Sequence, residues 1–216
     1  MENVKPIRIS CIGDSITAGT GCTGDVGSSD KNGKPYPSRL QFYLDKKAGE
    51  GKYLVSNFGK PCAAAIEDIN ICDTPYVLQE QYKNSLLSKP DIVLSMFGAN
   101  DAHAWARDGD IIEKDFIKGY RRLLYDYSSL TSHPRVIILL PIIAIRAKIA
   151  KVYDEKMLEL IKDIAVKENI ELFDIQDFTK EDKWSLDNYM HDDIHPNDAG
   201  YDRLGEKVAD LLLNLN

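Results

Sequence analysis

Cysteine is scarce in this chain of 216 residues, and basic residues are fewer than acidic ones. Four cysteines are too few for a disulfide scaffold of this length, and no Cys-x-x-Cys spacing indicates zinc. We therefore expect free thiols, with a bridge between Cys62 and Cys72 left open. Lys and Arg total 27 against 34 Asp and Glu, and the net charge of −7 disfavours nucleic acid and anionic membrane surfaces as partners.

No apolar run in the sequence is long enough to cross a membrane. The longest, residues 135–145, falls far short of the roughly 20 residues that a membrane helix needs, and Pro141 interrupts it. The first six residues lack the basic and apolar regions of a secretory leader, which favours a cytoplasmic location. Hydrophobic residues make up 44% and charged residues 28%, so we expect one folded domain over residues 1–216.

Short apolar runs alternate with helical patterns along the chain. Runs rich in β-branched residues predict five buried strands, at Ile7–Ile12, Tyr53–Phe58, Asp91–Phe97, Arg135–Leu140 and Ile170–Phe173. Apolar residues at helical spacing predict four helices, over Tyr36–Leu44 with Gly49 as its end, Ile112–Leu130, Tyr153–Ile164 and Tyr201–Leu211. Strands that are apolar almost throughout imply a parallel sheet covered on both faces. We predict an α/β fold, a three-layer α/β/α sandwich around a five-stranded parallel sheet.

A polar, glycine-rich stretch at Gly19–Lys34 follows the first predicted strand. In an open α/β sheet such a loop hangs over the carboxyl ends of the strands, where ligands bind, so we expect it to flank a site. Gly19, Gly21 and Gly24 match the G-x-G-x-x-G dinucleotide pattern, but six residues separate it from the strand and no helix signal follows it. We therefore expect no nucleotide cofactor.

Two histidines, His191 and His195, are spaced four residues apart, as metal ligands on one face of a helix would be. Pro196 disfavours a helical conformation of the residue before it. The spacing then no longer aligns the two imidazoles, and we expect no metal.

Three polar motifs fall at the ends of predicted strands or at the entry to the last helix. They are Gly13-Asp14-Ser15-Ile16 after the first strand, Gly98-Ala99-Asn100-Asp101 after the third, and Asp192-Asp193-Ile194-His195-Pro196-Asn197 before the last helix. Alone, each has an ordinary interpretation as a helix cap, a turn or a surface loop. Together they predict one site, because the fold brings the carboxyl ends of parallel strands to one edge of the sheet.

Ser15, His195 and Asp192 are the residue types that ester hydrolysis needs. A serine hydroxyl at a helix entry is a candidate nucleophile once a base takes its proton. His195 is the candidate base. Asp192, three residues earlier, can fold back onto the imidazole and fix its tautomer.

The motifs, in this order, resemble those of SGNH hydrolases in the GDSL esterase superfamily, and the likeness covers essentially the whole chain. It implies a flavodoxin-like sandwich and an oxyanion hole formed by the N–H of Ser15, the side chain of Asn100 and a backbone N–H of a second block. Family members commonly read Asn-x-Gly-x-x-Gly there, whereas this chain has Asn57-Phe58-Gly59-Lys60-Pro61-Cys62. Cys62 stands at the position of the last glycine, so either its N–H or that of Gly59 is left to complete the hole.

Within the superfamily, the stretch from Asn57-Phe58-Gly59 through Pro75-Tyr76 to Lys89-Pro90-Asp91 resembles bacterial carbohydrate esterases related to sialate O-acetylesterases. Asp14, Gly59 and His103 are candidate substrate contacts beside the motifs. Tyr76 and Trp105 lie near them in the sequence and are candidates for stacking on a sugar, although an aromatic beside a strand end belongs to the core as often.

From these features we expect a cofactor-free serine esterase that removes a small acyl group, above all acetyl, from a carbohydrate-like or other polar alcohol. Its partner would be a small-molecule ester. One alternative is a lysophospholipase or thioesterase that acts on longer chains. Another is a catalytically silent binding module, which the substitution at Cys62 alone favours. A third alternative, a flavodoxin-like electron carrier, would need a phosphate-binding loop after the first strand. Only Ser15 and Thr17 in that region have the side chains that such a loop uses.

Overall fold

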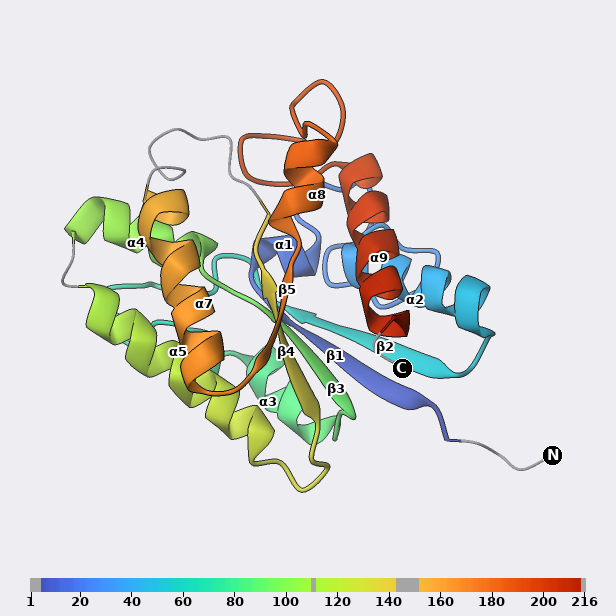
Figure 1. The fold of residues 1–216 in the computed structure, drawn as a ribbon, viewed down its shortest axis with the longest axis horizontal. Helices are drawn as coiled ribbons and strands as arrows, with labels where there is room; N and C mark the ends of the chain where they lie inside the picture. Colours follow the sequence, from blue (N-terminus) through green and yellow to red (C-terminus); the bar gives the residue numbers. More distant parts are fainter. Residues whose placement is uncertain (1–4, 110–111, 143–151, 215–216) are drawn as a thin grey trace.

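The computed structural model describes residues 5–109, 112–142 and 152–214 (Figure 1). At its centre lies a sheet of five parallel strands, β1 (Ile7–Gly13), β2 (Tyr53–Gly59), β3 (Ile92–Met96), β4 (Arg135–Leu140) and β5 (Glu171–Asp174). The strand order is β2-β1-β3-β4-β5. The predicted strands and the parallel sheet are confirmed, with strand ends shifted by a residue at most places.

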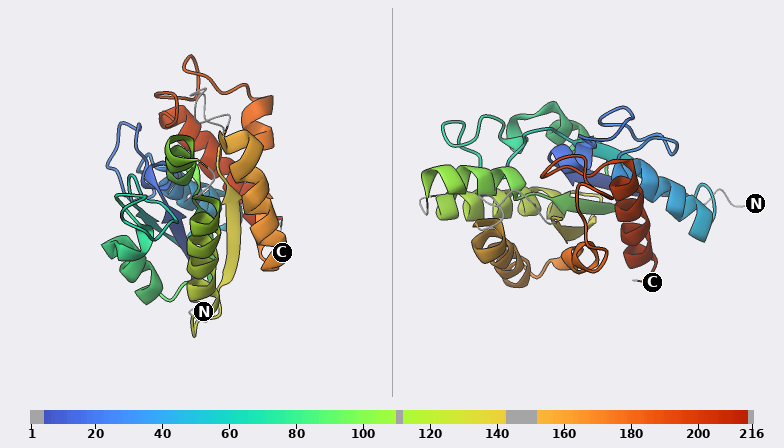
Figure 2. Two further views of the ribbon diagram at one scale, coloured as in Figure 1. Left: turned by 90° about the vertical axis from the view of Figure 1, so that its left-hand side faces the viewer. Right: turned by 90° about the horizontal axis from the view of Figure 1, so that it is seen from above.

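Helices cover both faces of the sheet, as the sequence predicts. α2 (Tyr36–Ala48) and α9 (Asp198–Leu213) pack together on one face, and α3 (Glu80–Leu87), α5 (Ile112–Ser128) and α7 (Leu158–Lys167) cover the other (Figures 1 and 2). Three further helices, α1 (Ser15–Ala18), α4 (Ala99–Asp108) and α8 (Gln176–Glu181), follow β1, β3 and β5. A 3-10 turn, η1 (Tyr76–Leu78), precedes α3, and a π-helical turn, η2 (Tyr153–Met157), precedes α7.

The last helix starts earlier than its apolar pattern, which begins at Tyr201. The side chain of Asn197 caps α9 by accepting a hydrogen bond of 3.1 Å from the N–H of Gly200. The first turn of α9 contains polar residues and so adds nothing to the apolar periodicity. In the sequence, only the capping residue Asn197 indicates where the helix begins.

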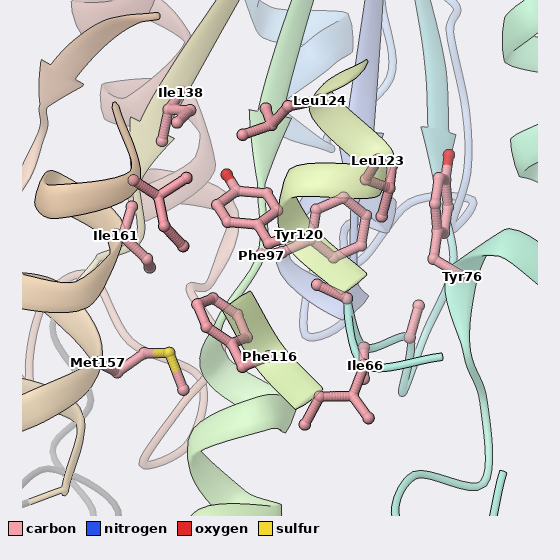
Figure 3. Close-up of a cluster of buried hydrophobic side chains, with 14 of the residues drawn as sticks. Ile66, Tyr76, Phe97, Phe116, Tyr120, Leu123, Leu124, Ile138, Met157 and Ile161 are labelled. Atoms are coloured by element: carbon pink, nitrogen blue, oxygen red, sulfur yellow. The ribbon is translucent and has the colours of Figure 1, made fainter. Parts of the chain in front are cut away.

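Successive strand residues face opposite sides of the sheet and so build two cores. In β1, Ile12 belongs to the core beneath α5, whereas Ile9 and Cys11 belong to the core beneath α2 and α9. Figure 3 shows the first core, where the ring of Tyr120 packs against those of Phe97 and Phe116. Burial on both faces explains why the strands are apolar almost throughout.

The loop between α1 and α2 flanks the site only with its first half. Its second half runs along β2, an edge strand, where Ser29 Oγ accepts a hydrogen bond of 2.8 Å from the N–H of Asn57. The side-chain amide of Asn57 donates to the carbonyl of Ser28 at 3.2 Å. This half therefore covers an open sheet edge, which would otherwise be free to pair with another chain.

All four cysteines are free thiols, so no bridge joins Cys62 and Cys72. Among the described residues, no helix is long and apolar enough to span a membrane. Nor do three or more His, Cys, Asp or Glu side chains of the described ranges gather where they could hold a metal. The cytoplasmic location stays a prediction.

Candidate active site

Ser15 lies at the first position of α1, directly beyond the carboxyl end of β1. Position 13, two residues before Ser15, accepts only glycine. A β-carbon on Gly13 would come within 2.2 Å of Thr17 Oγ1 and 2.5 Å of the carbonyl oxygen of Met96. The tight turn lets the chain pass from strand to helix within one residue. It brings the hydroxyl of Ser15 to the end of the sheet.

Asp14 is the N-cap of α1, and its Oδ1 accepts a hydrogen bond of 2.9 Å from the N–H of Ile16. Its side chain is 2% exposed, and burial raises the pKa of the carboxyl to about 7. The prediction that Asp14 contacts the substrate is therefore wrong, because its carboxyl group is buried and caps the helix.

Ser15, His195 and Asp192 form a continuous chain of hydrogen bonds. Ser15 Oγ lies 3.0 Å from His195 Nε2, and His195 Nδ1 lies 2.8 Å from Asp192 Oδ2. Seen from above in Figure 2, the segment that precedes α9 lies beside α1. The structure thus brings together the three residues that the sequence singles out.

The turn that carries the imidazole is built by Asp192 itself. Its Oδ1 accepts the backbone N–H groups of Ile194 and His195 at 2.8 and 2.7 Å. Burial pushes the pKa of the Asp192 carboxyl up, but hydrogen bonds from the His195 ring, the His195 N–H and the Ile194 N–H outweigh it, and the pKa is lowered overall. The carboxylate is therefore ionised at neutral pH and complements a protonated imidazole.

The segment around His195 is a loop and not a helix, as Pro196 predicts. The N–H of His191 donates to the carbonyl of His195 at 2.8 Å, and a short antiparallel bridge joins Met190 to Pro196. The four-residue spacing of the histidines therefore does not place them on one helical face.

Asn100 and Asp101 occupy the first turn of α4 and bind the chain segment that follows the second block. Asn100 Nδ2 donates to the carbonyl of Ala63 at 2.8 Å, and Asp101 Oδ1 accepts from the N–H of Ile66 at 2.9 Å. The carboxyl of Asp101 is fully buried, and this burial raises its pKa to about 6. One amide hydrogen of Asn100 is held by Ala63, and the other has no acceptor among the described residues.

Cys62 follows Lys60 and Pro61 in the second block and has a φ of 64°. This left-handed conformation favours glycine and costs other residues roughly 1 kcal/mol, which accounts for a glycine at this position in the resembling family. The side chain of Cys62 is exposed, and its N–H makes no hydrogen bond with any residue that the structure describes. It is free to bind a ligand.

Gly59 is a packing position. Its N–H donates to Asn57 Oδ1 at 2.9 Å, and a β-carbon there would lie 2.2 Å from the backbone nitrogen of Ala18 in α1. The prediction that Gly59 contacts the substrate is therefore wrong, because its N–H is already hydrogen-bonded and the residue packs against the backbone of α1. Of the two candidate donors in the second block, Cys62 is the one with a free N–H.

The aromatic candidates belong to the core. Tyr76 is fully buried (Figure 3), and its hydroxyl donates to the carbonyl of Phe58 at 2.7 Å. Trp105 is 4% exposed. Neither ring is presented to a sugar, so stacking on either one is wrong. His103, on the same helix as Trp105, is exposed and stays a candidate contact.

The model of the GDSL-like lipase/acylhydrolase family matches residues 11–203 of this chain. The chain belongs to this family. The match includes all three motifs and the second block, and it confirms the resemblance that the sequence carries. In this GDSL-family protein, the first motif leads into the short helix α1 at Ser15, and Cys62 in the second block has a positive φ.

Known relatives include esterases of acetylated sugars. An acetylxylan esterase from Xylanibacter ruminicola is 28% identical over 94% of this chain, which spans 42% of that relative's length. Among solved structures, an acetylxylan esterase from Geobacillus stearothermophilus has a TM-score of 0.68 and 20% identity, with 99% of this chain and 95% of that one covered. Catalytic mutants of the same enzyme, in which a serine, an aspartate or a histidine is replaced by alanine, match similarly.

A lipase/acylhydrolase from Enterococcus faecalis has a TM-score of 0.71 and 20% identity to the GDSL-family protein described here. The superposition covers 96% of this chain and 95% of that one. At such identities the two solved structures establish the fold, and they confirm the flavodoxin-like sandwich that the motifs imply.

The sequence places Asp101 in the third-strand motif but gives it no role in the site. Its carboxylate holds the backbone at Ile66, four residues beyond Cys62, and so fixes the segment that presents the candidate donor. The signal was its position directly after Asn100 at a helix start, where an acidic side chain is usually assigned to the helix dipole.

Proposed function

We propose that this protein is a serine esterase that removes small acyl groups, above all acetyl, from a carbohydrate-like alcohol. The observation that carries the proposal is the hydrogen-bonded chain from Ser15 Oγ through His195 to Asp192, with distances of 3.0 and 2.8 Å. Nucleophile, base and orienting carboxylate at such distances are the arrangement that activates a serine for attack on an ester.

In the first step, His195 Nε2 takes the proton of Ser15 as Oγ attacks the ester carbonyl carbon. The imidazole becomes a cation, and ionised Asp192 stabilises it and keeps Nδ1 protonated. The carbon–oxygen π pair moves onto the carbonyl oxygen, which becomes an oxyanion.

Three donors are assigned to that oxyanion. The N–H of Ser15 belongs to the first turn of α1, where helical N–H groups have no partner within the helix. The free N–H of Cys62 and the second amide hydrogen of Asn100 complete the set. Donors fixed in advance stabilise the developing charge without reorganisation, the largest single contribution in many acyl-transfer enzymes.

The tetrahedral intermediate then collapses. His195 returns its proton to the leaving alcohol oxygen as the carbon–oxygen bond breaks, and the acyl group stays on Ser15. Water, deprotonated by His195, hydrolyses this acyl-enzyme and restores the hydroxyl of Ser15. The steps balance with an ester and water alone, so the proposed chemistry uses no cofactor or metal.

The choice of an acetylated carbohydrate as substrate is supported by the relatives. The curated relative and the Geobacillus stearothermophilus enzyme are both acetylxylan esterases. Cys62 is exposed and stands where the resembling family commonly has glycine, so we expect its thiol to limit the length of the acyl chain that the site accepts.

The test is hydrolysis of acetylated xylooligosaccharides and of p-nitrophenyl esters from acetyl to octanoyl, with wild type and Ser15→Ala. We expect acetate release from the sugar, highest kcat/KM on the acetyl ester and loss of both activities in the variant. A rising profile with chain length would favour a lysophospholipase or thioesterase. Sugar binding in a calorimeter without hydrolysis would make the protein a silent binding module.

A further inference from the structure

The turn over residues 19–24 matches a nucleotide-binding pattern in the sequence, and the proposed chemistry assigns it no role. It leaves α1 directly, since the N–H groups of Gly19 and Thr20 both donate to the carbonyl of Ser15 at 2.9 Å. Gly19 ends the helix with a left-handed φ of 96°. The turn is therefore attached to the residue that carries the proposed nucleophile.

The same turn is bound to the start of α9. Thr23 donates to both carboxylate oxygens of Asp198, with its N–H at 2.8 Å and its hydroxyl at 2.6 Å. Tyr201, fully buried in the first turns of α9, donates its hydroxyl to the carbonyl of Thr20 at 2.7 Å. Since α9 begins just after His195, these bonds join the Ser15 segment to the His195 segment.

Gly21 lets the turn approach the base closely. Its φ is 95°, and a β-carbon there would lie 2.7 Å from the carbonyl oxygen of Pro196 and 3.1 Å from the β-carbons of His191 and His195. Only glycine suits both the conformation and the space. The backbone of the turn therefore packs directly on the segment that carries the imidazole.

We propose that Gly21, Thr23 and Asp198 are positioning residues that keep His195 Nε2 within hydrogen-bonding distance of Ser15 Oγ. The inference rests on the proposed function. It gives the glycine-rich turn over residues 19–24 the role of holding the Ser15 segment against the His195 segment. A misplacement of about 1 Å between reacting groups can cost a hundredfold in rate, so the contacts behind the imidazole affect turnover strongly.

The chain offers a matched control one turn further along α9. Asp202 accepts a hydrogen bond of 2.8 Å from the hydroxyl of Tyr43 and is paired with Arg39, much as Asp198 accepts from Thr23 and pairs with Lys34. Asp202, however, binds α2, and no hydrogen bond or ion pair joins it to a described residue of the turn. Replacing each aspartate by asparagine changes similar bonds, but only Asp198 bears on the base.

The experiment measures kcat and KM on p-nitrophenyl acetate, the rate at which a fluorophosphonate labels Ser15, and the Tm. We expect Asp198→Asn to lower kcat and the labelling rate by about tenfold or more, with KM within about twofold of wild type. Asp202→Asn should leave kcat and labelling within about twofold, with a similar change in Tm.

A second pair of variants separates the hydroxyl from the shape of the side chain. Thr23→Val removes the hydroxyl donor to Asp198 but keeps the backbone N–H donor and the volume, whereas Thr23→Ser keeps both donors. We expect the valine variant to lose kcat as Asp198→Asn does and the serine variant to restore it. Gly21→Ala should lose more, and if it fails to fold, the Thr23 pair decides.

Unchanged kcat and labelling in both Asp198→Asn and Thr23→Val, with only a lower Tm, would overturn the positioning role and leave the proposed function standing. A wild-type protein that neither hydrolyses acetyl esters nor labels at Ser15 would contradict the proposed function, and the positioning role with it.

Discussion

Ser15 Oγ lies 3.0 Å from His195 Nε2, although 180 positions separate the two residues in the chain. Ser15 is placed by the end of a central strand, and His195 by a loop that Asp192 folds and that α9 follows. Neither local structure alone defines the distance between them. The pair depends on the packing of the first and last parts of the fold.

Replacing either member of this pair should abolish turnover without unfolding the protein. We expect Ser15→Ala and His195→Ala each to lower kcat on p-nitrophenyl acetate by roughly a thousandfold or more, and the double variant to be scarcely worse, because the two residues act as a unit. The Tm should change little, since Ser15→Ala loses one side-chain hydrogen bond and His195→Ala loses two. A Ser15→Ala variant that keeps more than about a tenth of wild-type kcat would contradict the serine mechanism.

Asn100→Asp should reduce kcat by about 100-fold to 1,000-fold, because it removes an oxyanion donor and adds an acceptor of the same shape. KM on p-nitrophenyl acetate should change much less. Asp101→Asn is the matched control, since its amide oxygen can still accept from Ile66 and the donor of Asn100 is untouched. Equal losses in both variants would mean that Asn100 holds the segment at Ala63 and does not contact the reacting oxygen.

The strands and the three motifs were predictable because each is specified locally. A strand buried on both faces is apolar throughout, and Ser15, Asn100 and His195 each lie in a short motif with a definite chemistry. The expected aromatic contacts failed at Tyr76 and Trp105 because proximity in sequence does not determine which side of a segment faces the core.

Other features depend on partners far away in the chain. The residues around Gly21 do not predict that its backbone packs against His195. Likewise, the sequence at Ser29 does not predict its hydrogen bond to the edge strand β2. A glycine pattern reports only that a β-carbon is not tolerated. The group that excludes it belongs to the tertiary structure, which the sequence pattern does not contain.

Asp14→Asn should stabilise the protein above neutral pH. Burial raises the pKa of the Asp14 carboxyl to about 7, so between about pH 4 and 7 the native state holds a proton that the unfolded state has released. The free energy of unfolding therefore falls as pH rises through this window, by up to about 4 kcal/mol. The amide oxygen of asparagine can still cap Ile16 and carries no charge to bury.

Urea unfolding at pH 5, 7 and 8 checks this expectation. The wild type should lose stability between pH 5 and 8, and Asp14→Asn should lose less. A smaller decline should remain up to about pH 6, because the pKa of buried Asp101 is also raised, to about 6. Asp192, with its lowered pKa, contributes stability that is lost only below about pH 4, outside this range. The exposed Asp187→Asn serves as control and should follow wild type. Parallel wild-type and Asp14→Asn curves would show that the buried carboxylate does not take up the proton.

Cys62→Gly should keep or raise activity on acetyl esters and widen tolerance toward butyryl esters. Its N–H does not depend on the side chain, and glycine adopts the φ of 64° without the cost of a β-carbon. We expect removal of the thiol beside the proposed oxyanion site to give a longer acyl chain more room. The measurement is the ratio of kcat/KM on p-nitrophenyl butyrate to that on p-nitrophenyl acetate, which should rise several-fold.

Cys62→Ser is the control. Serine keeps a β-carbon and a side chain of similar size, so this variant should leave the ratio near that of wild type. A folded but inactive Cys62→Gly, or fluorophosphonate found on Cys62 in place of Ser15, would remove Cys62 from the role of oxyanion donor.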